Sequence, residues 1–249
     1  SVRISSEEFV SGGRSIRESR MAAKVLEEAG ADVISVSIGG YGIGQRTIAP
    51  QDLPPGYNAT NSAFIKEALT IPVMVAGRIA DPYVAEDIIS TGAADLVALG
   101  RGSLADPEFP IKVSEGRINE ITPCVACLQR CVGRGGRDEW DTGVSCTYNP
   151  FTGKEGVLKF KDADQPKRIA IIGGGPAGLE TAWVAAKRGH SVTLYDKNIK
   201  PGGQVAIGAM PPNKQEILNA IKSYVTLGQK FGVNYQFGVE ATSQMVEEF

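Results

Sequence analysis

The sequence predicts an α/β protein in which two α/β regions flank a cysteine-rich connector. Strand and helix patterns alternate over residues 1–105, as expected where helices connect parallel strands. A second strand–helix pattern follows Lys167 and contains a glycine-rich turn. The four cysteines of the chain all lie between these regions. With 249 residues, the chain has the length of one large or two medium domains.

The first region reads as a series of strands separated by helices. Its short, largely apolar strand runs suit parallel strands covered on both faces. A helix at about residues 16–29 stops at Gly30, and Asp81-Pro82 caps another that ends before Gly92. The series fits either a doubly wound sheet or part of a (β/α)8 barrel. The strands are expected at Val2–Ser5, Asp32–Ser37, Pro72–Ala76 and Asp95–Gly100, with a further helix near Ser62–Leu69 and a loop from Gly39 to about Thr60.

Two consecutive predicted strands end in a glycine–arginine pair. Gly77-Arg78 follows the third strand and Gly100-Arg101 follows the fourth. Backbone N–H and guanidinium groups at neighbouring strand ends suit a phosphate, and barrels place such a site after strands seven and eight. The alternative is that each pair is a turn glycine followed by a solvated arginine. The repeat at two strand ends favours phosphate binding.

Composition and charge disfavour several classes of partner. The formal net charge is −2 and the isoelectric point is near 5.6, so nothing favours a polyanion such as nucleic acid. The longest apolar runs are too short to span a membrane, and no signal peptide opens the chain. Clustered cysteines without scattered pairs favour a reducing compartment. We therefore expect a cytoplasmic protein that binds neither nucleic acid nor membranes.

The cysteines follow the pattern C-x2-C-x3-C-x14-C. Four thiolates without a nearby histidine suit a [4Fe–4S] cluster. A structural zinc site is the alternative, although zinc ribbons more often pair two C-x2-C units, and a chance grouping is the third interpretation. The compact group of three and the distant fourth cysteine favour iron–sulfur. The candidate ligands are Cys124, Cys127, Cys131 and Cys146.

The second region carries the pattern G-x-G-x-x-G at Gly173, Gly175 and Gly178. A strand-like run precedes these glycines, a helix-like run follows, and a second strand ends in Asp196, 18 residues past the third glycine. Such glycines let the backbone approach a pyrophosphate at a helix N-terminus, while the acid accepts a hydrogen bond from a ribose 2′-OH. A glycine-rich turn without a ligand is the alternative. The acid indicates FAD or NAD rather than NADP.

Three motifs in one order carry a family resemblance: the Gly-Arg pairs, then PCVACLQRC with SCTYNP, then IAIIGGGPAGLETA with VTLYDK and PGGQ. With them the chain resembles, over essentially its whole length, the iron–sulfur flavoenzymes related to old yellow enzyme. That group includes 2,4-dienoyl-CoA reductase, 2-enoate reductase and trimethylamine dehydrogenase. The resemblance implies the C-terminal half of a TIM-type (β/α)8 FMN barrel in residues 1–120, an iron–sulfur connector in residues 121–166, and the start of a Rossmann-like FAD/NAD(P)-binding domain in residues 167–249.

The resemblance also implies roles for single residues. Arg3 would face the N1/C2=O edge of the flavin and stabilise negative charge on reduced flavin; a solvated strand-end arginine is the alternative. The four cysteines would hold the cluster. The FMN phosphate would be held by Gly77, Arg78, Gly100 and Arg101. FAD would be lined by Gly173, Gly175, Pro176, Ala177, Gly178, Asp196, Lys197, Gly203 and Gln204.

The chain departs from the family in two respects. Counterparts exist for only four of the eight barrel strands, so the missing half must come from the same parent chain or from a partner, and we expect a homo-oligomer. Some family reductases have an active-site histidine in the loop after strand six, where this chain has Tyr41. Tyr41 would donate a proton, or it is a loop tyrosine without a chemical role.

The activity implied by the resemblance is that of an NAD(P)H-dependent flavin oxidoreductase with a small-molecule substrate. Electrons would pass from NAD(P)H to FAD, to the [4Fe–4S] cluster, to FMN, and then to the activated C=C bond of an enoate or dienoyl-CoA. One alternative is an amine dehydrogenase of the trimethylamine dehydrogenase type, which binds ADP in place of FAD. Another is a non-catalytic cofactor-binding fragment, and the 249 residues alone are expected to be inactive.

Overall fold

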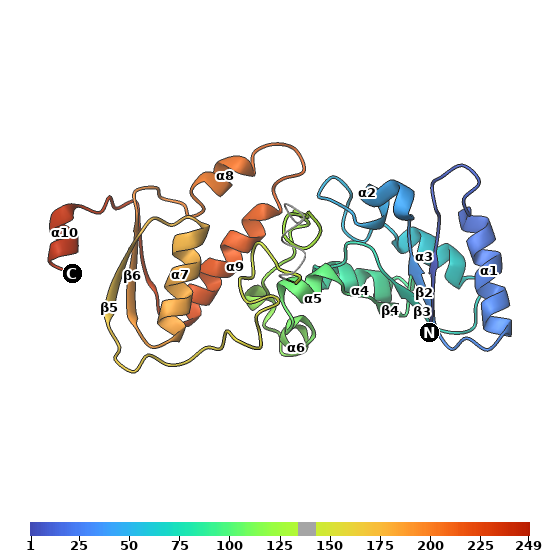
Figure 1. The fold of residues 1–249 in the computed structure, drawn as a ribbon, viewed down its shortest axis with the longest axis horizontal. Coiled ribbons are helices and arrows are strands. Elements are labelled where there is room, and N and C mark those ends of the chain that lie inside the picture. The colour runs from blue at the N-terminus through green and yellow to red at the C-terminus, as the bar shows by residue number, and fades with distance from the viewer. Residues whose placement is uncertain (134–142) are drawn as a thin grey trace. The chain divides into compact units, whose positions relative to one another are not determined.

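Two parallel sheets, one in each half of the chain, organise the fold (Figure 1). The computed structural model of the chain describes residues 1–133 and 143–249, and for Tyr41 the backbone only. The chain divides into one unit of residues 1–107 with 126–128, and a second unit of residues 108–125 and 129–249. Among the described residues, no helix combines the length and apolarity needed to cross a membrane.

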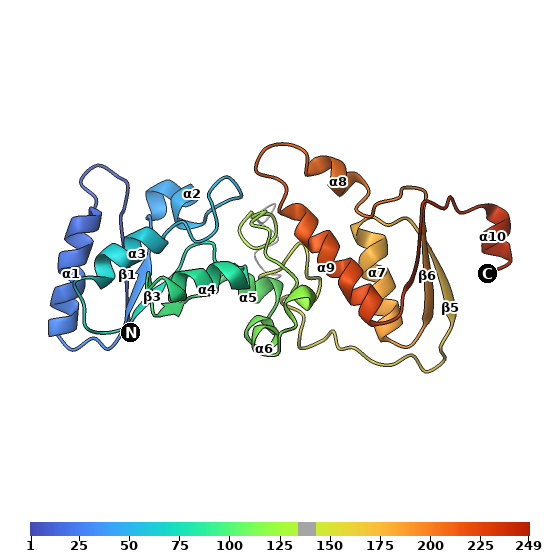
Figure 2. The same cartoon turned by 180° about the vertical axis from the view of Figure 1, so that it is seen from behind.

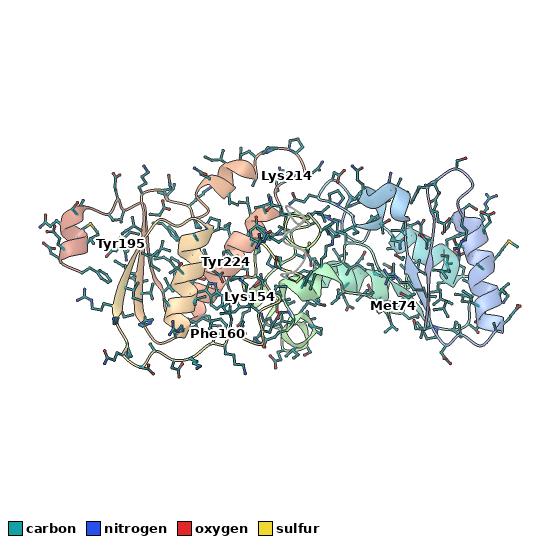
Figure 3. The ribbon with its side chains drawn as sticks, in the orientation of Figure 1. Met74, Lys154, Phe160, Tyr195, Lys214 and Tyr224 are labelled. Carbon is teal, nitrogen blue, oxygen red and sulfur yellow. The ribbon has the colours of Figure 1, made fainter. Side chains whose placement is uncertain are left out.

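The first unit is built on a four-stranded sheet whose order follows the chain. All three strand pairs are parallel, which confirms the predicted α/β class. The pairing aligns Arg3 with Ser35, and Ser35 with Met74, so these side chains share one face of the sheet. Figure 3 marks Met74 within this sheet. The strands are β1 (Val2–Ser5), β2 (Ile34–Ser37), β3 (Val73–Val75) and β4 (Leu96–Val97).

Helices pack on the other face of this sheet (Figure 2), and its apolar side chains are buried there. The first begins with a capping box, in which the Ser15 hydroxyl accepts from the Glu18 N–H and the Glu18 carboxylate accepts from the Ser15 N–H. The core is formed by Ile4, Ala23, Ile34, Val36, Ile65 and Val73. The main helices are α1 (Ile16–Glu28), α3 (Ala59–Lys66) and α4 (Pro82–Ser90), near the predicted positions.

Short helical turns occupy segments in which the sequence predicts no helix. The long loop after β2 contains the 3-10 turn η1 (Tyr41–Ile43) and α2 (Gly44–Thr47). A further turn, α5 (Arg101–Ala105), follows β4 directly. Each is too short to show the hydrophobic periodicity by which a helix is recognised in a sequence.

The second unit is built on a three-stranded parallel sheet in the order β5-β6-β7. Two long helices pack against each other, and the first also packs on the sheet. The core between them includes Leu179, Trp183, Leu194, Ile221 and Tyr224. The elements are β5 (Arg168–Ile172), α7 (Pro176–Lys187), β6 (Ser191–Asp196), α8 (Gln204–Gly208), α9 (Ile217–Lys230), β7 (Asn234–Phe237) and α10 (Ser243–Glu247), with α6 (Phe109–Ser114) and η2 (Ile118–Glu120) ahead of them.

Part of the connector is attached to this unit by aromatic packing. The ring of Phe160 lies 4.7 Å from that of Phe151 and 5.5 Å from that of Trp183, centroid to centroid, and Figure 3 shows Phe160 beside α7. The Lys187 ammonium lies 3.6 Å from the Phe160 centroid, a cation–π contact.

Glu180 is a partly buried acid on α7. Its Oε2 accepts a hydrogen bond from the Trp183 indole at 2.8 Å, whereas Oε1 has no hydrogen-bond partner among the described residues. Burial therefore raises the pKa of Glu180 to about 7, against the lowering effect of the Trp183 bond. Burial, and then the Glu180 charge, raise the pKa of Tyr224 on α9, which is marked in Figure 3.

We predict that Glu180 makes the second unit less stable at alkaline than at acidic pH. Its pKa is higher in the folded state, about 7, than the ordinary value of 4.5. Between these values the folded state holds the proton that the unfolded state has lost, so stability falls as pH rises and levels off above pH 7. The total loss is about 3 kcal/mol.

Urea unfolding at pH 5 and pH 8 measures this effect. Glu180→Gln is neutral throughout and should flatten the pH dependence, whereas Asp164→Asn, in the exposed connector, should leave it unchanged. An equal drop in stability between pH 5 and pH 8 in the Glu180→Gln variant would contradict the assignment.

Candidate cofactor sites

The two Gly-Arg pairs lie at one edge of the first sheet, beyond the carboxyl ends of β3 and β4. A Cβ placed on Gly102 would lie 3.5 Å from the Ile79 carbonyl oxygen, so the start of α5 packs directly against the turn after β3. Gly77 and Arg78 both have positive φ, +154° and +54°. The structure therefore brings both predicted phosphate-binding turns together.

Gly77 is required by close packing as well as by its backbone angle. A Cβ on Gly77 would lie 2.9 Å from the Asn58 Cβ, closer than real Cβ atoms approach, and 3.2 Å from the Tyr57 ring, which is tighter than most real contacts. A larger residue would push the loop before α3 away from the sheet. The resulting open turn beside two arginines fits a bound phosphate.

Asn58 is a buried residue that ties together the ends of three strands. Its Nδ2 donates to the carbonyl oxygens of Val36 and Ala76, at 3.3 and 3.0 Å, and its Oδ1 accepts from the Ser6 hydroxyl at 2.9 Å. The side chain is fully buried. Sequence reasoning missed this residue, because an asparagine in a polar loop carries no signal that it will be buried.

Arg101 is oriented by the long loop after β2. Its Nη1 donates to the Ala49 carbonyl oxygen at 2.8 Å. Burial raises the pKa of the nearby Tyr57, with Arg101 and Arg46 acting in the opposite direction. The Tyr57 hydroxyl donates to the Arg46 carbonyl oxygen. The loop is thus fastened to the arginine that we expect at the phosphate.

The remaining candidates of the first unit lie on or after β1 and β2. Arg3 is exposed on β1, and its Nη2 donates to the Ser37 hydroxyl at 3.2 Å. It therefore lies on the face of the sheet opposite the helices, and its role at the flavin N1/C2=O edge stays a prediction. Tyr41 begins η1, but its side chain lies outside the described part of the structure, so its catalytic role stays a prediction.

The glycine-rich turn of the second unit joins β5 to α7, as predicted. Gly175 is the N-cap of α7 and Pro176 is its first residue. A Cβ on Gly178 would overlap the Gly173 carbonyl oxygen, so only glycine allows the helix to lie this close to the strand. Gly173 has a φ of +108°. This geometry leaves the helix N-terminus open to a pyrophosphate, and exposed Ala177 lies in its first turn.

Asp196, at the end of β6, is bound to the same turn. Its Oδ2 accepts from the Gly174 N–H at 2.6 Å, and its Oδ1 accepts from the Asn198 N–H at 2.7 Å. Burial opposes ionisation, but the hydrogen bonds from Asn198 and Gly174 outweigh it and lower the pKa of Asp196. The carboxylate therefore holds the turn in place in addition to the predicted role at a ribose.

The PGGQ segment closes on the glycine-rich turn. The Gly202 N–H donates to the Gly174 carbonyl oxygen at 2.7 Å, and a Cβ on Gly203, which has a φ of +52°, would lie 3.3 Å from the Gly175 Cα. Gln204 follows as the first residue of α8. Lys197 is exposed beside Asp196. The structure thus brings Gly203 next to Gly175 of the glycine-rich turn, which lies 28 positions earlier in the chain.

The four cysteines are described, and all are partly buried. Among the residues that the structure describes, no three His, Cys, Asp or Glu side chains are grouped to hold a metal ion. Cys146 lies close enough to Tyr224 to raise the pKa of that phenol, after the larger effects of burial and Glu180. The cluster on Cys124, Cys127, Cys131 and Cys146 therefore stays a prediction from their spacing.

Comparison with known proteins gives both regions a family. Residues 1–120 match the model described as the NADH:flavin oxidoreductase / NADH oxidase family, and residues 171–219 match the NAD(P)-binding Rossmann-like domain. An NADH oxidase of Thermoanaerobacter brockii is 44% identical over 218 residues, which are 87% of this chain and 33% of that protein. A cinnamate reductase of Clostridium sporogenes is 37% identical over 243 residues, 98% of this chain and 36% of that protein.

A solved structure supports the same relationship. The complex of 2-naphthoyl-CoA reductase with 2-naphthoyl-CoA superposes with a TM-score of 0.90 at 30% identity, covering 99% of this chain and 37% of that one. Amine dehydrogenases are also among the relatives. The chain spans about a third of the length of the curated relatives that it matches.

These matches confirm the resemblance found in the motifs, and they agree with a flavin-type sheet edge in the first unit and a dinucleotide-type turn in the second. Residues 1–120 thus match the NADH:flavin oxidoreductase / NADH oxidase family, and the chain as a whole is similar to part of larger flavoenzymes.

Proposed function

We propose that the protein reduces an activated C=C bond with electrons from NAD(P)H. In the net reaction, NAD(P)H gives a hydride and solvent gives a proton, and the two saturate the α and β carbons of an enoate or enoyl thioester. The observation that carries this proposal is the pair of Gly-Arg turns at one sheet edge, within a region of the flavin oxidoreductase family. Similarity to a cinnamate reductase and to a 2-naphthoyl-CoA reductase supports the substrate class.

In the first unit, the chain's own residues would hold and tune a flavin mononucleotide. Gly77 and Gly100 would let the backbone approach the phosphate, while Arg78 and Arg101 would neutralise its charge. Arg3 would stand at the isoalloxazine, where a cation favours the reduced, anionic ring. Bound FMN would supply hydride transfer, which no side chain of the chain can perform.

In the second unit, the turn from Gly173 to Gly178 would hold the pyrophosphate of FAD, or of ADP in its place. Gly203 and Gln204 would close over the same turn. An acid at the end of the second strand accepts a ribose hydroxyl in such folds, and Asp196 has lone pairs left after the bonds that it makes to Gly174 and Asn198.

A [4Fe–4S] cluster on the four cysteines would connect the two flavin sites. Hydride transfer needs direct contact between donor and acceptor, whereas single electrons can pass through iron and sulfide, which is the chemistry the cluster would supply. Anaerobically prepared protein should accordingly contain iron and acid-labile sulfide. Stoichiometric zinc without sulfide would identify the structural alternative.

Amine oxidation is the second candidate, because amine dehydrogenases occur among the relatives. In that reaction the flavin accepts electrons from the substrate, and the second nucleotide site holds ADP. The two reactions run in opposite directions at the flavin, so one assay separates them.

We predict that, once the missing half of the barrel is supplied by the parent chain or a partner, NADH bleaches the flavin under anaerobic conditions and cinnamate restores its colour, with one NADH consumed per cinnamate reduced. The physical reason is that an enoate is a hydride acceptor and an amine is a donor. The measurement is flavin absorbance with product analysis. Bleaching by dimethylamine and none by NADH would favour the amine reaction, and no bleaching by either would contradict both.

We predict that Arg101→Gln releases FMN more readily than Arg3→Gln does. A guanidinium contact to a phosphate dianion is a charge-assisted bond, stronger than a contact to the neutral ring edge. Arg3→Gln should instead lower the flavin reduction potential. FMN retained on a desalting column, and potentiometry of the remainder, measure the two effects. Equal FMN loss in both variants with an unchanged potential would show that the roles are not divided this way.

We predict that Asp196→Ala weakens binding of ADP by about 1–3 kcal/mol, the cost of losing a charged acceptor. Calorimetric titration with ADP and with 2′-deoxy-ADP separates a direct ribose contact from loss of the turn. If Asp196 contacts the ribose directly, the unaltered chain should bind ADP more tightly than 2′-deoxy-ADP, and Asp196→Ala should bind the two equally. Asp164→Ala, in the exposed connector, is the control. Unchanged affinity in Asp196→Ala would leave Asp196 with only its bonds to Gly174 and Asn198.

A further inference from the structure

Arg46 carries a positive charge without a carboxylate partner among the described residues, at the edge of the first sheet where we expect the flavin. It lies in α2, within the loop that follows β2. Its side chain is exposed, and its guanidinium lies 5.2 Å from the centroid of the Phe9 ring. Phe9 belongs to the loop that follows β1, so the two residues come from adjacent strand ends.

Other arginines of this unit that contact rings or acids have their charge compensated. Arg20 also lies over an aromatic ring, that of Phe64 at 4.5 Å, but it is paired with Glu67 at 2.9 Å. Arg14 is paired with Glu8 at 3.4 Å. The contact between Arg46 and Phe9 therefore leaves a cation against an aromatic face with its charge available to an incoming anion.

The surroundings hold Arg46 in this place. Its carbonyl oxygen accepts from the Tyr57 hydroxyl, and the neighbouring Thr47 hydroxyl donates to the Gly40 carbonyl oxygen at 2.9 Å. The Ala49 carbonyl oxygen accepts from Arg101, the candidate phosphate ligand. The backbone on both sides of Arg46 is thus fixed to the edge that carries the candidate FMN site.

Phe9 is held with similar firmness. It has a φ of +51°, a conformation that a bulky residue adopts only when its surroundings require it. Two residues earlier, the Glu7 carbonyl oxygen accepts from the Gly39 N–H at 2.7 Å, which joins this loop to the loop of Arg46. The neighbouring Val10 is 45% exposed and Phe9 is 40% exposed. A cation on an anchored backbone and an exposed apolar surface therefore lie side by side.

We propose that Arg46 and Phe9 form a specificity site for a carboxylate attached to a flat apolar group, such as an aryl or alkenyl acid. The guanidinium would bind the two carboxylate oxygens, and the Phe9 ring would pack against the apolar part. The inference rests on the proposed alkene reduction and assigns to it a free-acid substrate. An acyl thioester or a neutral enone lacks the anion that this site selects.

The test compares cinnamate with cinnamamide, which has the same shape and no charge. Binding to the FMN-containing protein is measured from the shift of the flavin absorbance. Arg46→Gln should weaken cinnamate binding roughly ten- to a hundred-fold, the loss of a charge-assisted contact, and should leave cinnamamide binding unchanged. Arg46→Lys keeps the charge without the planar guanidinium, so its affinity for cinnamate should lie between that of the unaltered protein and that of Arg46→Gln.

Lys24→Gln is the matched control. It removes one positive charge from the same unit and should leave cinnamate binding unchanged. Lys24 lies on α1, eight residues and about 12 Å beyond the start of that helix. If cinnamate is turned over, Arg46→Gln should raise KM with little change in kcat, because the contact exists in both ground and transition states.

The outcomes separate this inference from the proposed reaction. Equal binding of cinnamate and cinnamamide by the unaltered protein, or equal loss of both in Arg46→Gln, overturns the role of Arg46. NADH-dependent reduction of a neutral alkene alongside that result leaves the proposed reaction standing. Arg46-dependent binding of cinnamate without any NADH-dependent reduction supports the anion site and overturns the reaction.

Discussion

The Asn58 side chain is the interaction on which the candidate flavin edge depends. Burial of a backbone carbonyl group is costly unless it finds a donor, and the Val36 carbonyl oxygen accepts from the Ala76 N–H at 2.9 Å as well as from Asn58. Asn58 donates to Val36 and Ala76 and accepts from Ser6, so one amide joins the ends of β1, β2 and β3. Because Asn58 lies so close to Gly77, it leaves no room for a side chain at position 77, and it thereby shapes the turn beside Arg78.

The second sheet uses a carboxylate for the same purpose. Asp196 accepts from the backbone of Gly174 and of Asn198, which joins the first turn after β5 to the end of β6. Gly202 then donates to Gly174 from the opposite side. In both units a buried polar side chain holds a glycine turn at the carboxyl ends of parallel strands, which is where open α/β sheets and barrels bind ligands. Position in the sheet, rather than the motif alone, makes these turns suitable for phosphates.

The distribution of charge suggests how the two sites differ. At the edge of the first unit, Arg3, Arg46 and Arg101 supply cations, and Arg46 has no carboxylate partner among the described residues. The second turn has an ionised acid and a helix N-terminus. Cations suit a flavin phosphate and an anionic substrate, whereas the acid suits the hydroxyls of an adenosine ribose. Reduction of an aryl or alkenyl acid by a nicotinamide would use both arrangements.

The α/β class, the strand positions of the first unit and the strand–turn–helix at Gly173–Gly178 could be predicted from the sequence, because they follow from local periodicity and from spacing along the chain. The sequence also placed Gly77-Arg78 and Gly100-Arg101 at strand ends, although their proximity depended on β3 and β4 being neighbours. Only the tertiary structure showed that Asn58 is buried, that Asp196 binds the Gly174 backbone, and that Arg46 lies over Phe9. Each of these contacts joins residues 18 or more positions apart through side chains that look like ordinary loop or strand-end residues. Their roles arise from the packing of parallel strands, which no local pattern encodes.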